Sequence, residues 1–442
     1  MRILLITPRS EFPDITPGWL RIPQMSLLIL AELASSNHHV RVLDEEIEPV
    51  PWNEPWDVVG ISLMTATAMR GYHLSFKFRL LGAKVILGGI HPSILPEEAS
   101  RHADAVVVGE AEGVWPLILQ DIEANKLQRI YQDKIPDIKK VPLIRYNGKS
   151  KSFPPTFDPL IASRGCPRSC EFCCVQNIYG RKIKQLPVEQ VIAQINLRRS
   201  RKVIFLDDNL VASRSWALEL FTGLKPYRLK IIGQVPAKFI LDDELFNAAV
   251  SAGLKGIFVG VETIDDGALP HFRKALPAEG YIKAIRRCRK AGVFFHAALI
   301  FGMDFHSASI FDRTLTFIIK HKVPSVSAYV LTPYPGTALF DRILKEDRIL
   351  HFNWSYYDHL TPVFRPAKMT FEALMEGYMQ FRQHLFSMKG IFLRAAAQFG
   401  VAPVAFLGSN FGFRRTTRLL KQHYDGYKAW LESNTAAELG MG

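Results

Sequence analysis

Short apolar segments alternate with amphipathic segments along the first 115 residues. The pattern predicts strands at 3–7, 40–43, 58–63, 84–87 and 105–108, and helices at 26–35, 69–80 and 113–125. Such an alternation is typical of an open parallel sheet that helices cover on both faces. Sheets of this kind bind ligands outside the carboxyl ends of their strands. The candidate ligand contacts are therefore the residues at those ends, Ser62, Gly88, Gly89, His91, Gly109 and Glu110.

The glycines at this rim allow two interpretations. Each can close a tight turn between a strand and a helix, or it can let a ligand approach the backbone closely. Three glycines at one rim, Gly88, Gly89 and Gly109, favour the ligand. The first strand is not followed by the glycine spacing of a nicotinamide-binding turn, which disfavours a dinucleotide domain.

A second alternating pattern follows a polar, lysine-rich connector at 125–152. It predicts six further strands, at 160–163, 203–206, 230–233, 256–261, 294–301 and 325–331. Strands that alternate with helices over this length indicate a barrel or part of one, with its site at the carboxyl ends of the strands. From residue 369 onward the pattern is helical. Its apolar stripe is expected to face the core and consists of Phe371, Leu374, Met375, Tyr378, Phe381 and Leu385.

The composition is that of an ordinary globular protein. The 442 residues are 48% hydrophobic and 22% charged, which excludes disordered, collagen-like and disulfide-knotted classes. The formal net charge is +13, and residues 151–370 hold 31 basic against 19 acidic side chains. This excess fits a positive wall around an anionic cofactor or substrate, and it equally fits a solvated surface. The apolar run at the start is too short for a signal peptide, so we expect a cytoplasmic protein.

Four of the five cysteines fall within nine positions, at Cys166, Cys170, Cys173 and Cys174. A tight cluster in a long chain indicates a metal or cluster site in a reducing compartment. Thiolates at 166, 170 and 173 can hold three irons of a four-iron cluster and leave the fourth iron open. Structural zinc is the main alternative, but it takes four ligands, usually as two separated pairs, and no second pair is apparent. Packing is the expected role of Cys174 and of the solitary Cys288.

The Cys-x3-Cys-x2-Cys segment, preceded by Ser163, Arg164 and Gly165, resembles the radical S-adenosylmethionine superfamily. The resemblance implies a partial (β/α)6 barrel in which Cys166, Cys170 and Cys173 ligate a 4Fe-4S cluster. It also implies that S-adenosylmethionine lies across the strand ends and contacts Phe172, Gln234, Glu262, Ile300 and Gly302. For Asp207, Asp208 and Glu262, capping of the helices that follow their strands is the alternative role.

The amino-terminal segments Val59 to Ser62, Leu87 to Pro92 and Val108 to Glu110 resemble the cobalamin-binding domain of one large subfamily. The two resemblances together cover about residues 1–340. An Asp-x-His-x-x-Gly segment, whose histidine ligates cobalt in many cobalamin domains, does not occur in the sequence. Its absence is common in this subfamily, although it also fits a domain that has lost the cofactor. His91 is a candidate contact rather than an established cobalt ligand.

The sequence thus predicts an α/β chain of three domains. Residues 1–145 form a doubly wound, Rossmann-type sheet that resembles a cobalamin-binding domain, residues 146–345 a partial barrel, and residues 346–442 a mainly helical segment. By resemblance, the protein is a cobalamin-dependent enzyme that generates a 5′-deoxyadenosyl radical and methylates an unactivated carbon. Its substrate is expected to be a small or lipid-like molecule, and a flavodoxin or ferredoxin its electron donor.

Three alternatives stay open. One is a radical cyclase or oxidoreductase without methyl transfer, and another is a non-catalytic iron–sulfur or cobalamin-binding regulator. The third, an RNA methylthiotransferase, usually has three more cysteines in its amino-terminal domain, whereas residues 1–165 contain none. No small strand-rich RNA-binding module is apparent at the carboxyl end either, so nucleic acid is not an expected partner. The aromatic and basic residues of the C-terminal helices fit a substrate lid or a peripheral membrane contact.

Overall fold

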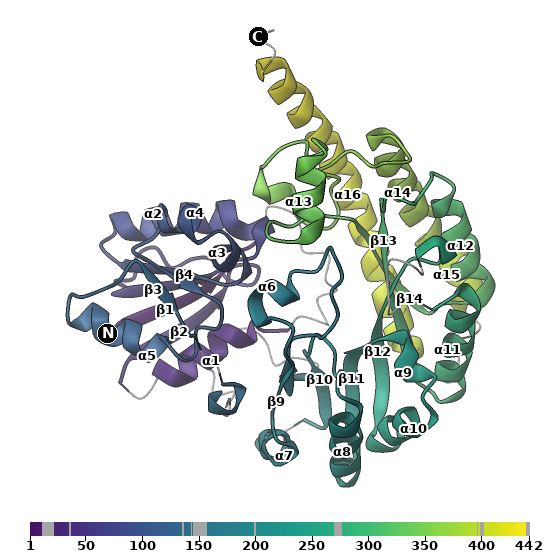
Figure 1. Cartoon of the computed structure of the whole chain (residues 1–442), viewed down its shortest axis with the longest axis horizontal. Coiled ribbons are helices and arrows are strands. Elements are labelled where there is room, and N and C mark those ends of the chain that lie inside the picture. The colour runs from purple at the N-terminus through teal and green to yellow at the C-terminus, as the bar shows by residue number, and fades with distance from the viewer. Residues whose placement is uncertain are drawn as a thin grey trace.

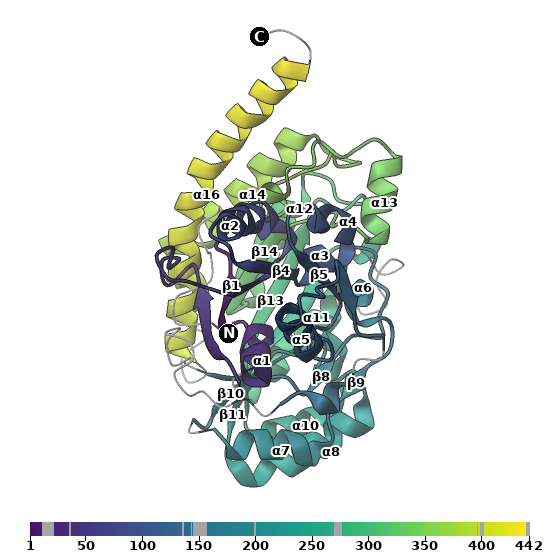
Figure 2. The same cartoon turned by 90° about the vertical axis from the view of Figure 1, so that its left-hand side faces the viewer.

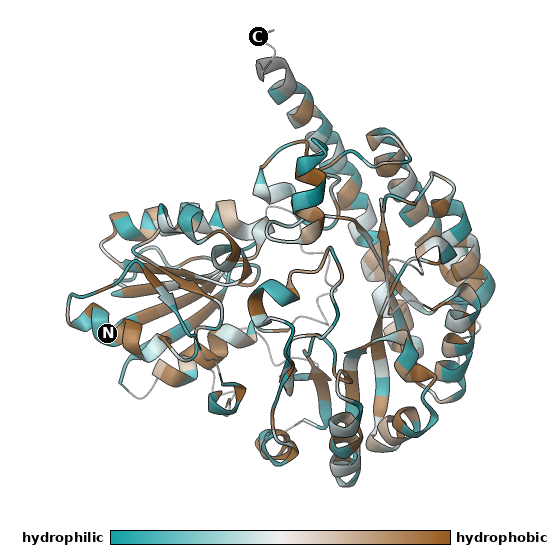
Figure 3. Ribbon diagram, in the orientation of Figure 1, coloured by the Kyte–Doolittle hydropathy of each residue, from teal (hydrophilic) through white to brown (hydrophobic). Residues whose placement is uncertain are grey.

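The computed structural model describes residues 1–10, 22–34, 37–134, 137–142, 144, 157–198, 200–268, 276–395, 397 and 402–438. Two six-stranded parallel sheets lie side by side, and a group of helices follows them along the chain (Figure 1). Apolar residues follow the strands of both sheets (Figure 3). The predicted fold class is confirmed, while the domain boundaries stay a prediction.

The amino-terminal sheet has the strand order β2-β1-β3-β4-β5-β6, and every neighbouring pair is parallel. One face packs on α1 and α5 and the other on α2, so the central strands are apolar on both sides. The bounds are β1 Arg2–Thr7, α1 Met25–Ala34, β2 His39–Asp44, β3 Val58–Ser62, α2 Ala68–Leu80, β4 Lys84–Gly88, α3 Ile90–Ile94, α4 Pro96–Ser100, β5 Ala105–Val108, α5 Trp115–Glu123 and β6 Ile130–Gln132.

Strand β6 was not predicted, because its residues lie in the segment interpreted as a connector. It is three residues long and only the central one, Tyr131, is buried. A pattern of this length carries too little periodicity to separate a strand from a loop.

The second sheet has the order β14-β13-β12-β11-β10-β7, again parallel throughout, so the carboxyl ends of all six strands meet at one rim. All six predicted strands are present. The bounds are β7 Asp158–Leu160, α7 Val188–Asn196, β10 Lys202–Phe205, α8 Arg214–Leu224, β11 Lys230–Val235, α9 Ala237–Ile240, α10 Asp243–Ala252, β12 Leu254–Glu262, α11 Ala278–Lys290, β13 Phe294–Phe301, α12 Ile310–His321 and β14 Ser325–Val330.

The first predicted barrel strand divides in two. The barrel strand β7 ends at Leu160, and the chain then forms β8 (Ser163–Arg164), which pairs antiparallel with β9 (Lys184–Gln185). The loop between β8 and β9 contains the four clustered cysteines and the short helix α6 (Val175–Tyr179).

The carboxyl-terminal part is helical, as predicted. It contains α13 (Ala338–Lys345), α14 (Phe371–Leu385), α15 (Met388–Ala395) and α16 (Pro403–Glu438), and α16 runs along one edge of the molecule before extending beyond it (Figure 2). The predicted stripe on α14 packs in the barrel core, where all of its members but the half-buried Phe371 are buried. Cys288 on α11 is fully buried, and burial raises the pKa of its thiol to about 12, which confirms its packing role.

Trp354, Tyr357 and Val363, which follow the barrel in the chain, pack in the core of the amino-terminal sheet. The chain therefore returns to its first domain and ties the two sheets together. Within the described ranges, the helices are all too short or too polar to cross a lipid bilayer.

Candidate functional site

The cysteine loop begins at a glycine that no other residue could replace without strain. Gly165 has φ +86°, and a Cβ there would lie 2.8 Å from the carbonyl oxygen of Lys182. Its N–H donates to Oδ2 of Asp208 at 2.9 Å. The β8–β9 ladder closes the base of the loop, and the N–H of Cys173 donates to the carbonyl of Cys170 at 3.0 Å. The loop is therefore an ordered structure built by its own backbone.

Two aspartates at the end of β10 brace this loop. Asp207 accepts hydrogen bonds from the Ala162 N–H at 3.2 Å and from the Ser163 hydroxyl, and burial raises its pKa to about 7. Asp208 accepts from Gly165 as described above. The helix after β10 has Ser213 as its N-cap residue, so the capping role considered for the aspartates is wrong. The two aspartates instead hold β8 and the first residue of the cysteine loop in place.

Helix α13 supports the loop from a distant part of the chain. The N–H of Leu339 donates to the carbonyl of Glu171 at 2.9 Å, and Arg342 Nη2 donates to the Glu171 carboxylate at 3.2 Å. Asn177 also donates to the carbonyl of Gly336. The sequence gives no local signal for these contacts, because the partners lie more than 150 residues apart.

A cavity of about 530 Å³, here called the barrel cavity, lies between the cysteine loop and the strand ends. Its lining includes Cys166 and Cys173 and four of the predicted S-adenosylmethionine contacts, Phe172, Gln234, Glu262 and Ile300. Glu262 has φ +63° at a register shift between β12 and β13. A left-handed conformation is uncommon outside glycine, and such residues cluster at functional sites.

Two predicted residues lie outside this lining. Cys170 stays within the loop, between the two cysteines that reach the cavity. Gly302 follows β13 with φ +93°, and a Cβ there would lie 3.0 Å from the side chain of Leu374. One side of Gly302 therefore faces the packing between β13 and α14, and its contact with S-adenosylmethionine stays a prediction.

The three cysteines have the donor chemistry that a four-iron cluster needs. All are partly exposed on one loop beside Arg168, which is the only Lys or Arg among the described residues that line the barrel cavity. Among the described residues, no three His, Cys, Asp or Glu side chains are grouped as they would be around one metal ion. A four-iron cluster makes a different demand, because each of its thiolates binds a separate iron. The donor set therefore fits the cluster.

Several side chains at the barrel cavity are polar but uncharged. His296 Nδ1 lies 2.9 Å from Ser325 Oγ, and its Nε2 lies 2.8 Å from Ser327 Oγ. The hydroxyl of Tyr334 lies 3.0 Å from Nε2 of His359. Burial lowers the pKa of both histidines to about 4, so both are neutral at pH 7. His296, Ser325 and Ser327 were not predicted to belong to the site, although a histidine and two serines in otherwise apolar strands were a usable signal.

We predict that His296 makes the protein sensitive to acid. Because its pKa falls from about 6.5 to about 4 on folding, its contribution to stability is complete above pH 6.5 and is lost as the pH falls toward 4. For a fully buried group, the loss between pH 7 and pH 5 is about 2 kcal/mol. Urea unfolding at both pH values should show that His296→Gln loses about 2 kcal/mol less than the unaltered protein over this interval.

The exposed His73 on α2 provides the control for this prediction. His73→Gln should leave the pH dependence of the unfolding free energy unchanged. Equal pH dependence in His296→Gln and the unaltered protein would show that His296 does not titrate in this way.

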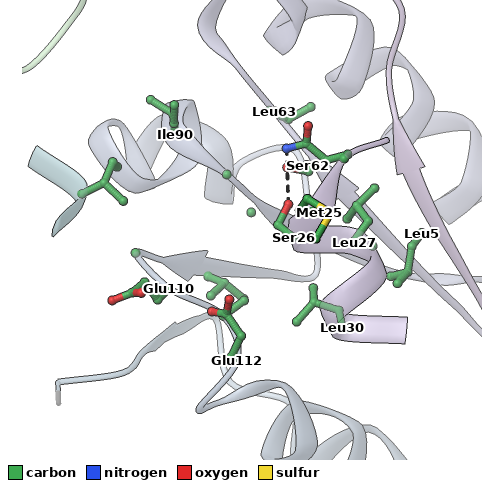
Figure 4. Close-up of a pocket in the computed structure, with 18 of the residues that line it drawn as sticks. Leu5, Met25, Ser26, Leu27, Leu30, Ser62, Leu63, Ile90, Glu110 and Glu112 are labelled. Atoms are coloured by element: carbon green, nitrogen blue, oxygen red, sulfur yellow. Dashed lines mark hydrogen bonds between the residues drawn. The ribbon is translucent and has the colours of Figure 1, made fainter. Parts of the chain in front are cut away.

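A second cavity, of about 460 Å³ and here called the rim cavity, lies between the two sheets (Figure 4). Helix α1 and the carboxyl rim of the amino-terminal sheet form one side, and the start of the barrel forms the other. Gln24 Nε2 donates to Ser26 Oγ at 3.3 Å at its edge. Gly89 has φ +98°, and a Cβ there would lie 2.6 Å from the Leu63 carbonyl oxygen. The lining includes the predicted residues Ser62, Gly88, Gly89, Gly109 and Glu110.

His91 is not among the residues that line the rim cavity. Its ring is fully buried on α3, with Nε2 at 3.1 Å from the Tyr72 hydroxyl and 3.2 Å from Glu98. Trp354 packs edge-on at 5.6 Å and donates from its indole N–H to Glu98 at 3.1 Å. The structure therefore places His91 in the packing between the amino-terminal domain and the segment after the barrel, which does not support the expected cofactor contact.

A buried cluster of ion pairs joins the two sides of the rim cavity. Arg164 donates through one terminal nitrogen to Glu110 and through the other to Glu112, and Lys184 also donates to Glu110. Arg164 and Glu110 are each 7% exposed. Part of the positive charge near the cysteines is thus paired with carboxylates. Other basic residues that follow the cysteines in the sequence, such as Arg181 and Lys202, are exposed on the surface.

Comparison with known proteins agrees with the family resemblance that the cysteine motif indicated. Residues 160–318 match the family model of the radical SAM superfamily. Bacteriochlorophyllide d C-8(2)-methyltransferase of Chlorobaculum tepidum is 28% identical over 393 residues, which are 84% of this chain and 87% of that protein. Bacteriochlorophyllide d C-12(1)-methyltransferase of the same organism is 26% identical over 415 residues, 88% of each chain.

The solved structure of TsrM, a radical S-adenosylmethionine methyltransferase from Kitasatospora setae with cobalamin and a [4Fe-4S] cluster bound, has a similar fold. Its TM-score is 0.68 with 15% sequence identity, and the match covers 96% of this chain and 99% of that chain. The similarity therefore extends over both sheets and the C-terminal helices.

Proposed function

We propose that this chain is a cobalamin-dependent C-methyltransferase of the radical S-adenosylmethionine superfamily, whose family model matches residues 160–318. One observation supports this most directly. The barrel cavity and the rim cavity both have Asp208 in their lining. Two cofactor sites at these positions would be neighbours, separated by the residues that brace the cysteine loop.

The residues present fit the two cofactors. Cys166, Cys170 and Cys173 would hold a 4Fe-4S cluster, and Phe172, Gln234, Glu262 and Ile300 would contact S-adenosylmethionine in the barrel cavity. Cobalamin would occupy the rim cavity against Ser62, Gly88, Gly89, Gly109 and Glu110. No histidine is among the described residues that line this cavity, so cobalamin would be held by apolar and backbone contacts. When bound, these groups would supply a 5′-deoxyadenosyl radical and a methyl group.

The task of the protein is then to position the substrate and exclude water. In the net reaction, a substrate carbon loses one hydrogen atom to form 5′-deoxyadenosine and gains one methyl group in its place. The lining of the barrel cavity includes neutral His296, Ser327 and His359, which offer hydrogen bonds without charge. This fits a small or lipid-like molecule with an apolar body and a neutral polar group. The relatives named above are methyltransferases of bacteriochlorophyllide d.

Each methylation would consume two molecules of S-adenosylmethionine, one cleaved to 5′-deoxyadenosine and one as the methyl source, and two electrons in all. A flavodoxin or ferredoxin would supply the electrons, which fits the cytoplasmic location expected from the clustered cysteines.

The test is an anaerobic reconstitution of the full chain with iron, sulfide and cobalamin. We expect visible absorption from both cofactors and formation of 5′-deoxyadenosine after reduction. With S-adenosylmethionine deuterated in its methyl group and a bacteriochlorophyllide d as probe substrate, mass spectrometry should detect the labelled methyl group in the product. The same mixture without reductant is the control.

Two of the alternatives give different results in this experiment. A radical cyclase or oxidoreductase would form 5′-deoxyadenosine while its substrate lost hydrogen and gained no methyl group. A non-catalytic regulator would bind cofactor and form no 5′-deoxyadenosine. Either result would overturn the proposed methyl transfer.

A further inference from the structure

The C-terminal helices contribute nothing to either cavity in the part of the chain that the structure describes, where the last lining residue is His359. They nevertheless carry a group of solvent-exposed large apolar side chains, each between 43% and 83% exposed. We call this group the C-terminal apolar surface. Its residues are Met388, Phe392 and Leu393 on α15, and Val404, Leu407 and Phe411 on α16.

The three members on α16 share one face of that helix. Val404, Leu407 and Phe411 recur at helical spacing, and the exposed Arg415 and Arg418 continue the same stripe. The opposite face packs against the barrel through the buried residues Phe406, Asn410, Phe413 and Thr417. The first half of α16 therefore carries large apolar residues on its solvent-facing side as well as on its buried side.

Hydrogen bonds hold α15 and α16 in this orientation. Arg394 on α15 donates to Asn410 Oδ1 on α16 at 2.7 Å and to the Leu385 carbonyl at 2.9 Å. Asn410 in turn donates to the carbonyl of Pro324, just before β14, at 3.0 Å. Both Arg394 and Asn410 are fully buried. The apolar side chains cannot turn inward without breaking this buried network.

The ionised side chains in the segment that carries this surface are all basic. Residues 377–424 contain no Asp or Glu. Four basic side chains in this segment are exposed, Lys389, Arg415, Arg418 and Lys421. An exposed apolar stripe flanked by Lys and Arg is the pattern by which helices lie in the headgroup region of anionic membranes. A second copy of this chain would bring like charges together, which disfavours self-association through the same face.

We propose that the C-terminal apolar surface docks this protein onto an anionic lipid bilayer. Phe392, Val404 and Phe411 insert between the headgroups, while Arg415 and Arg418 contact lipid phosphates. This proposal goes beyond the enzymatic function and does not depend on it, because neither cavity takes part. It accounts for a large apolar and basic surface that the catalytic site leaves unused.

The test is co-sedimentation of the full chain with two kinds of vesicle. One contains phosphatidylcholine alone, and the other equal parts of phosphatidylcholine and phosphatidylglycerol. We expect at least tenfold stronger binding to the anionic vesicles, weakened by added salt. Phe392→Asp/Phe411→Asp should abolish binding. Arg415→Gln/Arg418→Gln should weaken it at least tenfold, since each basic side chain near the surface contributes roughly fivefold.

Helix α2 offers a matched control. Phe76 and Leu80 are 60% and 72% exposed, but the neighbouring Arg79 is paired with Asp104 at 3.4 Å. Phe76→Asp/Leu80→Asp should therefore bind anionic vesicles as well as the unaltered protein does. Circular dichroism and melting temperature check the fold of each variant, and the single change Val404→Asp, at an 83% exposed position, tests the surface with the least disturbance.

Three results would overturn the proposal. The first is equal sedimentation with neutral and anionic vesicles, or none with either. The second is an equal loss of binding in the α2 control. The third is a dimer that Phe392→Asp/Phe411→Asp dissolves while vesicle binding stays absent, which would assign the surface to self-association.

Discussion

Replacing Cys166, Cys170 and Cys173 together with alanine is expected to abolish the visible absorption of the reconstituted cluster and all formation of 5′-deoxyadenosine. The reason is that the three thiolates are the proposed ligands of three irons, and alanine offers no donor atom. The variant should still fold. Gly165, Asp207 and Asp208 hold the loop through backbone and carboxylate hydrogen bonds that do not involve a thiol. Iron content, absorption spectra and chromatography of the cleavage products measure the effect.

The chain supplies two matched cysteine controls. Cys174→Ala removes the adjacent thiol, which also lines the barrel cavity, and should leave the cluster and cleavage in place. Cys288→Ala removes a buried core thiol on α11 and should lower the free energy of unfolding by about 1 kcal/mol without changing the absorption. A cluster that persists in the triple variant, or that is lost in Cys174→Ala as completely, would refute the ligand assignment.

The sequence predicted those parts of the site that depend on local patterns. Ser62, Gly88, Gly89, Gly109 and Glu110 were expected at one rim because parallel strands end on the same side of a sheet, and all five line the rim cavity. The cysteine spacing likewise indicated one loop. These inferences needed only strand positions and a topological rule.

Contacts between distant segments could not be predicted in the same way. The partners of Arg164 and of Glu171 lie at least 50 residues away along the chain, and only the folded chain brings them together. His91 shows the converse case. It stands just beyond a strand end, where a ligand was expected, yet its ring is buried and packs against Trp354. Position at a rim does not determine the direction of a side chain.

Arg164 illustrates both cases. It belongs to the motif before the cysteines, which the sequence shows, but its partners are known only from the folded chain. It connects β8, which leads into the cysteine loop, with Glu110 and Glu112 at the rim of the other sheet. Through this residue the two proposed cofactor sites share one buried electrostatic contact. The relative position of the two sheets therefore depends on a charge balance as well as on apolar packing.

Arg164→Met is expected to lower the free energy of unfolding by about 3 kcal/mol, because removing one partner of a buried ion pair leaves the other charge uncompensated. Glu110 would retain Lys184, whereas Glu112 would lose its partner in this cluster. Replacing Arg164 together with both of its partners, in Arg164→Met/Glu110→Gln/Glu112→Gln, should recover most of the loss, since exchange of buried ion pairs for neutral groups is often nearly neutral. Lys184, the remaining member of the cluster, is 21% exposed and can be hydrated. Urea unfolding of the cofactor-free protein at pH 7 measures all variants.

Arg214 is the control. It pairs with two carboxylates, Asp242 and Glu244, as Arg164 does, but it lies in solvent. Arg214→Met should leave the unfolding midpoint unchanged, as exposed ion pairs are screened by water and salt. If it destabilised the protein as much as Arg164→Met, burial would not be the cause. If the triple variant were as unstable as Arg164→Met alone, the loss would come from the packing of the arginine side chain, and the charge balance between the sheets would have to be abandoned as its explanation.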